Sequence, residues 1–169
     1  MKRYLLIILL FSLALQGYAR TGEKTVSKSG VMFAMSECKN YEGVDLVSLG
    51  RFSTFALKQA IRFAAKDDPD AREALDLMKG IHRITVMDYE SCSSPVRARI
   101  SRRLENALSG SELLMEAGDS GDKIRMYGLM DEKVGSIKDF VLFSPSDYSL
   151  ICIFGSISMD AVAKLSSDD

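Results

Sequence analysis

Residues 140–154 read FVLFSPSDYSLICIF, and this stretch decides the fold. It contains two apolar runs of strand length, 140–143 and 150–154, on either side of a turn sequence, Ser-Pro-Ser-Asp, at 144–147. Neither run alternates apolar with polar residues, as a strand with one solvated face would. Both runs therefore predict central strands that are covered on both faces or paired across a subunit contact.

Two further strand-like segments precede this pair, which makes four in all. Residues 112–117, 123–130, 137–143 and 149–154 are separated by turn residues, among them Gly-Asp-Ser-Gly-Asp at 118–122. Four consecutive strands with short connections predict an antiparallel meander.

The first half of the chain mixes strands with helices. Residues 31–35 form a short apolar run that predicts a first strand, and polar residues 36–43 end it. Residues 81–89, with Ile84, Thr85 and Val86, predict a second strand.

Helical spacing marks the segments between these strands. Phe52, Ala56, Ala60 and Phe63 recur along one side of a predicted amphipathic helix. A second predicted helix restarts at Pro69 and ends before Gly80, a third runs from Ser94-Pro95 to Gly110, and a short helix closes the chain over 158–165.

The predicted order is β-α-α-β-α-β-β-β-β-α. We therefore expect an α+β fold with a mainly antiparallel sheet of about six strands, backed by helices.

The N-terminal residues predict export. Two basic residues, Lys2 and Arg3, precede a short apolar stretch, and Gly17 and Ala19 supply small residues for cleavage, so residues 1–19 are interpreted as a signal peptide. Residues 20–29 are expected to form a flexible lead-in, 30–166 a single domain and 167–169 a polar tail. Arg20 follows the predicted cut where a lipoprotein needs cysteine. The expected product is thus periplasmic or secreted, not lipidated, and without stable membrane insertion after cleavage.

Charge and composition exclude some partners. The chain carries 22 Lys and Arg against 23 Asp and Glu; loss of Lys2 and Arg3 leaves 20 against 23, a net charge of −3. This mild balance predicts no general affinity for nucleic acid or anionic lipid.

Three cysteines cannot form a closed disulfide framework. Cys38 and Cys92 each follow a strand-like run, so they are the one pair considered for a bridge. The alternative is that Cys38, Cys92 and Cys152 are small buried hydrophobic residues.

The sequence contains no Gly-x-Ser-x-Gly, Cys-x-x-Cys, phosphate-binding glycine loop or His-Glu-x-x-His motif. His82 is the single histidine and begins a predicted strand, where an ordinary structural role is favoured over catalysis. The serines around Cys92 are explained as helix-capping residues before Pro95. No catalytic residue, metal or cofactor is therefore predicted.

Three groups of residues leave a binding role open. The acidic groups 67–70 and 119–122 lack the ligand series of a calcium loop, and a helix start and a turn explain them. Arg99, Arg102 and Arg103, with Arg97 nearby, are a candidate contact for an anion or an acidic partner, or simply the solvated face of a helix. The methionines are interpreted as core rather than as a binding groove; they include Met32, Met35, Met115, Met126 and Met130.

Residues 30–36, 113–130 and 148–160 together resemble domain-of-unknown-function family 4252, small exported proteins typical of Bacteroidetes. These are packing motifs, so the resemblance transfers no catalytic residue. Many members of that family look like lipoproteins, and this chain departs from them at Arg20. The resemblance also implies a link to envelope sensing or stress response, because genes of the family often lie near those of extracytoplasmic sigma factors.

From these features we expect a non-enzymatic exported protein that binds an envelope protein or a glycan. Two alternatives stay open: an enzyme whose carboxylates are grouped only in the fold, and a structural homo-oligomer joined through the apolar last strands.

Overall fold

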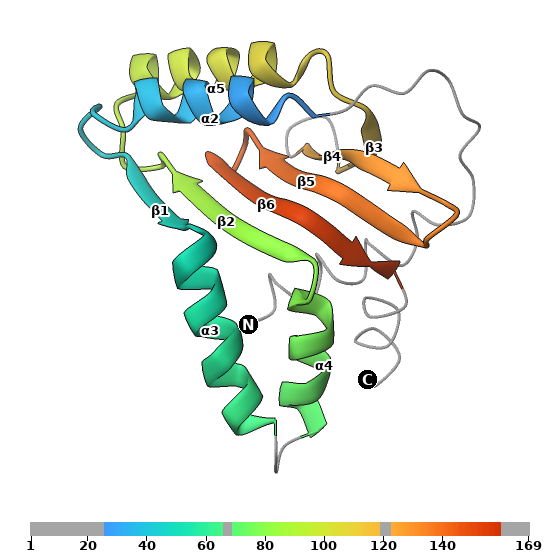
Figure 1. Cartoon of the computed structure of the whole chain (residues 1–169). Helices are drawn as coiled ribbons and strands as arrows, with labels where there is room; N and C mark the ends of the chain where they lie inside the picture. The colour runs from blue at the N-terminus through green and yellow to red at the C-terminus, as the bar shows by residue number, and fades with distance from the viewer. Residues whose placement is uncertain (1–25, 66–68, 119–122, 160–169) are drawn as a thin grey trace.

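The computed structural model describes residues 26–65, 69–118 and 123–159, which form a six-stranded antiparallel sheet with helices (Figure 1). The strand order is β1-β2-β6-β5-β4-β3. The helices are α2 (Lys28–Cys38), α3 (Arg51–Ala64), α4 (Pro69–Met78) and α5 (Ser94–Leu108). The strands are β1 (Asp45–Leu49), β2 (Ile81–Asp88), β3 (Leu113–Ala117), β4 (Ile124–Asp131), β5 (Ser136–Ser144) and β6 (Ser149–Ser158).

The predicted α+β class and the meander are confirmed, and from β1 to β6 the element order matches the predicted one. The predicted closing helix lies, from residue 160 on, outside the described residues.

The two strands without polar alternation lie at the centre of the sheet, as predicted. β6 pairs with β5 on one side and with β2 on the other, in a register that places Val141 opposite Cys152 and Leu142 opposite Ile151. Val141 and Cys152 face one hydrophobic core, whereas Leu142 faces another. Both faces of this strand pair are therefore covered.

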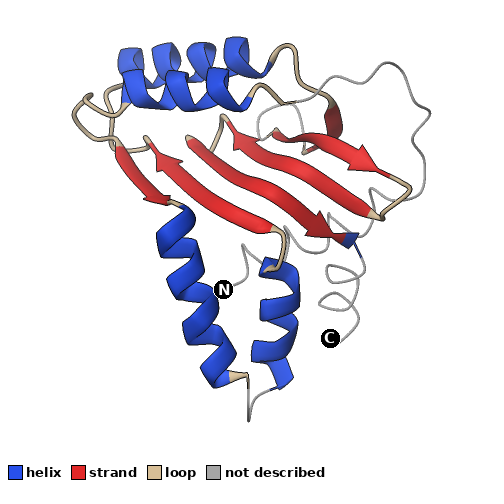
Figure 2. Cartoon of the chain, in the orientation of Figure 1, coloured by secondary structure: helices blue, strands red, loops and turns tan. Residues whose placement is uncertain are grey.

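Two hydrophobic cores lie on opposite faces of the sheet. The first core includes Met35, Tyr89, Leu104, Val141 and Phe154, and α2 and α5 lie side by side above it (Figure 2). The second core is smaller, includes Met78, Ile81 and Leu142, and receives partial cover from α3 and α4 through Ile61 and Leu77. This difference in cover leaves the α3–α4 hairpin projecting from the sheet (Figure 1).

The predicted first strand at 31–35 is wrong, because these residues belong to α2. Val31, Ala34, Met35 and Cys38 are the buried residues of this segment, and their spacing of three and four is that of a helix face. Ser27 caps the helix by accepting a hydrogen bond from the backbone N–H of Gly30 at 3.3 Å. The apolar run Val-Met-Phe-Ala-Met hid this period because Phe33, in its middle, points to solvent.

The first strand of the sheet is instead β1, an edge strand whose mixed exposure gives little sequence signal. The predicted flexible lead-in also ends too late. Val26 is buried in the first core and Lys28 begins α2, so residues 26–29 belong to the folded part rather than to the lead-in.

The close approach of β6 to the turn before β2, near Gly155, gives a prediction about stability. Gly155 has a φ of +127°, and a Cβ there would overlap the carbonyl oxygen of Gly80. We expect Gly155→Ala to lower the free energy of unfolding by about 2–4 kcal/mol in urea denaturation. Gly110→Ala is the control, since nothing lies within 4 Å of its added methyl group. It should be neutral or stabilise by about 0.4–1 kcal/mol, and an equal loss in both variants would contradict the assignment.

Candidate functional site

The apolar side of α3 faces outward. In a helix that backs a sheet, an apolar stripe is the side expected to face the core. Here Phe52 is 84% exposed, Phe55 58% and Phe63 70%, and Ala56 and Ala60 of the same stripe are also exposed. The helix was correctly predicted from these residues, and the structure shows that they do not pack into either core.

A different set of residues attaches α3 to the sheet. The hydroxyl of Thr54 is buried and donates a hydrogen bond to the carbonyl of Leu49 at 3.2 Å. The Lys58 ammonium donates to the carbonyls of Lys79 at 3.0 Å and Ile81 at 2.6 Å. Ile61 contacts the second core and Ala65 is buried. Polar anchors thus hold the inward side, and the phenylalanines are left on the outward side.

We call the side chains of Phe52, Phe55 and Ala56 the outward face of α3. Scattered exposed apolar residues are common on protein surfaces, but aromatic residues gathered on one helix face mark a contact surface. This face is the first candidate functional site.

A second candidate lies where the sheet changes register. Register shifts occur between Ile81 and Arg83 in β2 with β6, and between Lys138 and Phe140 in β5 with β6. The row of shifts continues at Tyr127/Leu129 between β4 and β5 and at Leu113/Met115 between β3 and β4. Such bulges bend strands and redirect side chains, and they are frequent near functional sites.

Three polar side chains meet at this row. The Lys28 Nζ atom of α2 lies 3.3 Å from Asp139 Oδ1 and 3.2 Å from His82 Nε2, and it also lies 4.8 Å from the centre of the Phe154 ring. Asp139 has a φ of 50°, and its Oδ1 accepts a hydrogen bond from the Gly155 N–H at 3.0 Å. Because an ammonium group can only donate, Nε2 of His82 is the acceptor in this contact and its proton lies on Nδ1.

The electrostatics of this cluster keep His82 neutral. Burial lowers the pKa of His82 from its ordinary 6.5, and the Lys28 charge lowers that pKa further. The Lys28–Asp139 ion pair is partly exposed, with side-chain exposures of 40% and 33%. The cluster brings together a cation, an anion and a neutral imidazole, so its charges are already balanced. It fastens the start of α2 to the bulge row, and we assign it a structural role.

The arginines of the predicted anion site all lie on α5, and one of them is paired within the chain. Arg103 pairs with Glu37 of α2 at 3.1 Å, whereas Arg99 and Arg102 are exposed. Arg97 lies over the Tyr148 ring, 4.3 Å from its centre. Arg97 and Arg103 therefore have contacts within the chain, whereas Arg99 and Arg102, three residues apart on the same helix, stay exposed.

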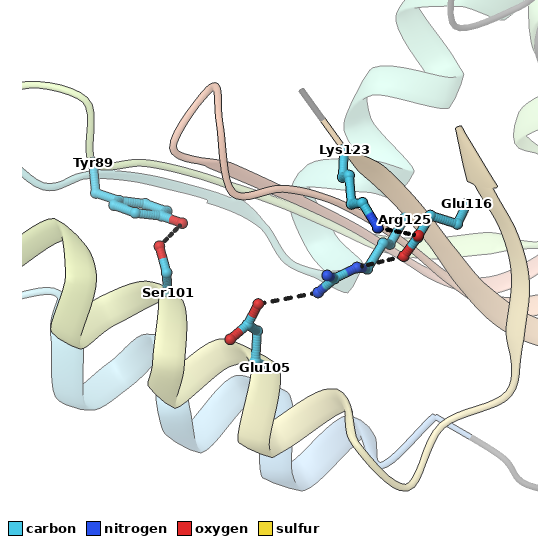
Figure 3. A network of polar contacts seen from close by, with 6 residues as sticks. All are labelled: Tyr89, Ser101, Glu105, Glu116, Lys123 and Arg125. Carbon is cyan, nitrogen blue, oxygen red and sulfur yellow. Dashed lines mark hydrogen bonds and ion pairs between the residues drawn. The ribbon is translucent and has the colours of Figure 1, made fainter. Parts of the chain in front are cut away.

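A charged network that the sequence analysis did not predict lies at the β3 edge of the sheet (Figure 3). Arg125 of β4 donates to Glu116 of β3 at 2.9 Å and to Glu105 of α5 at 3.0 Å. Lys123 and Arg125 donate hydrogen bonds to Glu116 and hold the pKa of its carboxyl below the usual value. Because these carboxylates already have cationic partners, the network ties α5 to the sheet edge.

The hydroxyl of Tyr89, the residue after β2, contacts the same helix in Figure 3. It forms a 2.9 Å hydrogen bond with Ser101 of α5, and burial raises the pKa of Tyr89 to about 12. The phenol therefore stays protonated and serves packing.

All three cysteines are buried free thiols of the first core. Burial raises the pKa of Cys38 and of Cys92, and a neighbouring arginine partly offsets this effect at each thiol, Arg103 at Cys38 and Arg97 at Cys92. Cys152 is more deeply buried, with its pKa raised to about 12. A bridge between Cys38 and Cys92 remains a prediction; in this structure both thiols are free and belong to the same core.

The methionines are core residues, as the sequence indicated. Met35 and Met126 are buried, and Met32, Met115 and Met130 pack against the two cores.

Of the acidic groups considered for calcium, 67–68 and 119–122 lie outside the described residues. Within the described ranges, no group of three or more His, Cys, Asp or Glu side chains is placed to hold a metal ion. In those same ranges no helix is long and apolar enough to span a bilayer.

The fold defines a small α+β protein with one antiparallel sheet and one helix, α3, whose apolar side is exposed. A family model described as Domain of unknown function (DUF4252) matches residues 41–165, and the chain belongs to this family. The match begins after α2, so the resemblance drawn from residues 30–36 lies outside the matched residues. No match is found among curated proteins or among solved structures.

The lowered pKa of His82 predicts a pH dependence of stability. Below its ordinary pKa of 6.5 the unfolded chain binds a proton that the folded His82 resists. The free energy of unfolding should therefore be fully developed above pH 6.5 and fall as the pH drops through the interval below it. Urea unfolding between about pH 7.5 and pH 5.5 measures how the free energy of unfolding changes with pH. This interval lies above the pH range where most carboxyls titrate.

The His82→Gln variant should lose part of that slope, and Lys28→Met should raise the pKa of His82, measured by NMR on the single histidine. An unchanged slope in His82→Gln, or an imidazole titrating above 6.5, would contradict the described cluster.

The burial of the cysteines predicts slow thiol chemistry. In reduced protein at pH 8, iodoacetamide should leave Cys38, Cys92 and Cys152 unmodified in the native state and should modify all three in urea. Mass spectrometry of non-reduced protein from exporting cells tests the bridge separately. Three free thiols in the protein from exporting cells would exclude the Cys38–Cys92 bridge. Fast alkylation of the native protein would contradict the burial of the cysteines.

Proposed function

We propose that this protein is an exported, periplasmic or secreted binding protein that acts without catalysis and makes contact through the outward face of α3. The binding serves envelope sensing or stress response, as the family resemblance implies. The leader-like residues 1–19 support export.

The observation that carries the proposal is the exposure of Phe52 and Phe55 on a helix held by polar anchors on its other side. Burial of a phenylalanine side chain is worth about 1.5–3 kcal/mol. The folded chain forgoes this stabilisation at both positions. A partner that covers both rings gains it, which gives the exposed face a physical use.

Of the arginines predicted from the sequence, Arg99 and Arg102 stay exposed, whereas other charged side chains have partners inside the chain. Arg103 is paired with Glu37, and Glu116 is paired with Lys123 and Arg125. The outward face of α3 is thus the better candidate contact surface.

Site-specific photo-crosslinking in exporting cells tests this proposal. A photoreactive amino acid at position 55 should give adducts to a protein or to a lipid, identified by mass spectrometry, whereas one at Phe33, which is 65% exposed on α2, should not. The two positions are matched in residue type and exposure, so general surface reactivity affects both. Adducts of equal yield at both positions, or none at position 55, would count against α3 as the contact surface.

A further inference from the structure

The charge of α3 differs from that of the chain as a whole. Its sequence, RFSTFALKQAIRFA, holds three basic residues, Arg51, Lys58 and Arg62, and no acidic one, whereas the whole chain has a net charge of −1. Charges at a surface act over roughly 8 Å at physiological ionic strength, so a partner of α3 meets its local charge and not the average. The net charge of the chain therefore does not describe the outward face of α3, although α4, the other helix of the same hairpin, holds Asp70, Glu73 and Asp76.

The cations of α3 divide between its two sides. Lys58 is turned inward and donates to the carbonyls of Lys79 and Ile81. Arg51 and Arg62 are exposed, and they precede and follow Phe55 by four and seven residues, which places them on the same side of the helix. The exposed aromatic rings are thus bordered by guanidinium groups.

This combination limits what can cover the surface. If α3 packed antiparallel against α3 of a second copy, Arg51 of each copy would approach Arg62 of the other, with no acidic residue of either helix to separate the like charges. A neutral apolar partner would leave the guanidiniums without a counter-charge. The surface therefore fits a partner that presents anions directly beside apolar material.

We infer that the outward face of α3 binds an anionic phospholipid surface; this rests on the proposed function and names its partner. Lipid phosphates lie at the depth of the guanidiniums when phenylalanine rings enter the boundary between headgroups and acyl chains. A helix with basic residues beside an aromatic stripe has the pattern of such interfacial helices. The hairpin that carries α3 projects from the sheet, so a flat surface can reach it (Figure 1).

Vesicle flotation tests the inference with protein purified from exporting cells, its N-terminus read by mass spectrometry and identical in every variant. The probes are phosphatidylethanolamine vesicles with phosphatidylglycerol, and phosphatidylcholine vesicles without anionic lipid. We expect at least about tenfold more protein to float with the anionic vesicles, and less as salt rises. Phe52→Ser with Phe55→Ser should reduce binding about tenfold or more, and Arg51→Gln with Arg62→Gln should reduce it and flatten its salt dependence.

The matched control is Phe33→Ser, which removes an equally exposed ring from α2 and should bind as the original protein does. Urea unfolding of each variant confirms that the fold is retained, as expected for exposed positions. Equal binding to both vesicle types, or equal loss in Phe33→Ser, would overturn the inference.

Three results separate this inference from the proposed function. Position-55 adducts to a protein, without vesicle binding, would overturn the lipid surface and keep α3 as a contact surface. Self-association without lipid that Phe52→Ser with Phe55→Ser abolishes would assign the face to a second copy instead. Absence of both adducts and vesicle binding would overturn the inference and the proposed function together.

Discussion

The structure depends on one constraint: the two central strands, β5 and β6, have no polar face. Val141 and Cys152 require cover on one side of the sheet, and Leu142 requires it on the other. The helices α2 and α5 satisfy the first requirement with a continuous layer (Figure 2). The second face receives only partial cover from α3 and α4, so the two sides of the sheet differ in what they can offer a partner.

The same asymmetry explains where polar contacts are placed. Glu37 with Arg103, Tyr89 with Ser101, and Glu105 with Arg125 fasten the α2–α5 layer to itself and to the sheet. The two ion pairs lie at the border of the first core, where water supports the charges and where each pair contributes little to stability by itself, whereas Tyr89 is buried within that core. They fix the position of the helices, and apolar burial supplies most of the stability.

Much of the fold could be predicted because local patterns agree with the final packing. The run at 140–154 indicated central strands, and Ser94-Pro95 located the start of α5. The strand at 31–35 was wrong because an apolar run of five residues does not distinguish a strand from a buried helix turn. β1 gave no signal because an edge strand can expose most of its side chains.

The candidate site was harder to predict, since periodicity identifies the apolar side of α3 but not the direction in which it points. The contacts of Lys28 with His82 and Asp139 span 54 and 111 residues, and no local pattern reports such distances.

The row of register shifts has a consequence for how this family can change. Deleting one residue at a bulge in a single strand would turn the rest of that strand over, and core residues would face solvent. Each neighbouring strand pair from β2 to β3 has a register shift along the same row. A change in one strand therefore alters its pairing with the next strand as well. A change in the length of a turn leaves this row intact, whereas an insertion or deletion inside one strand disturbs the pairing of its neighbours as well.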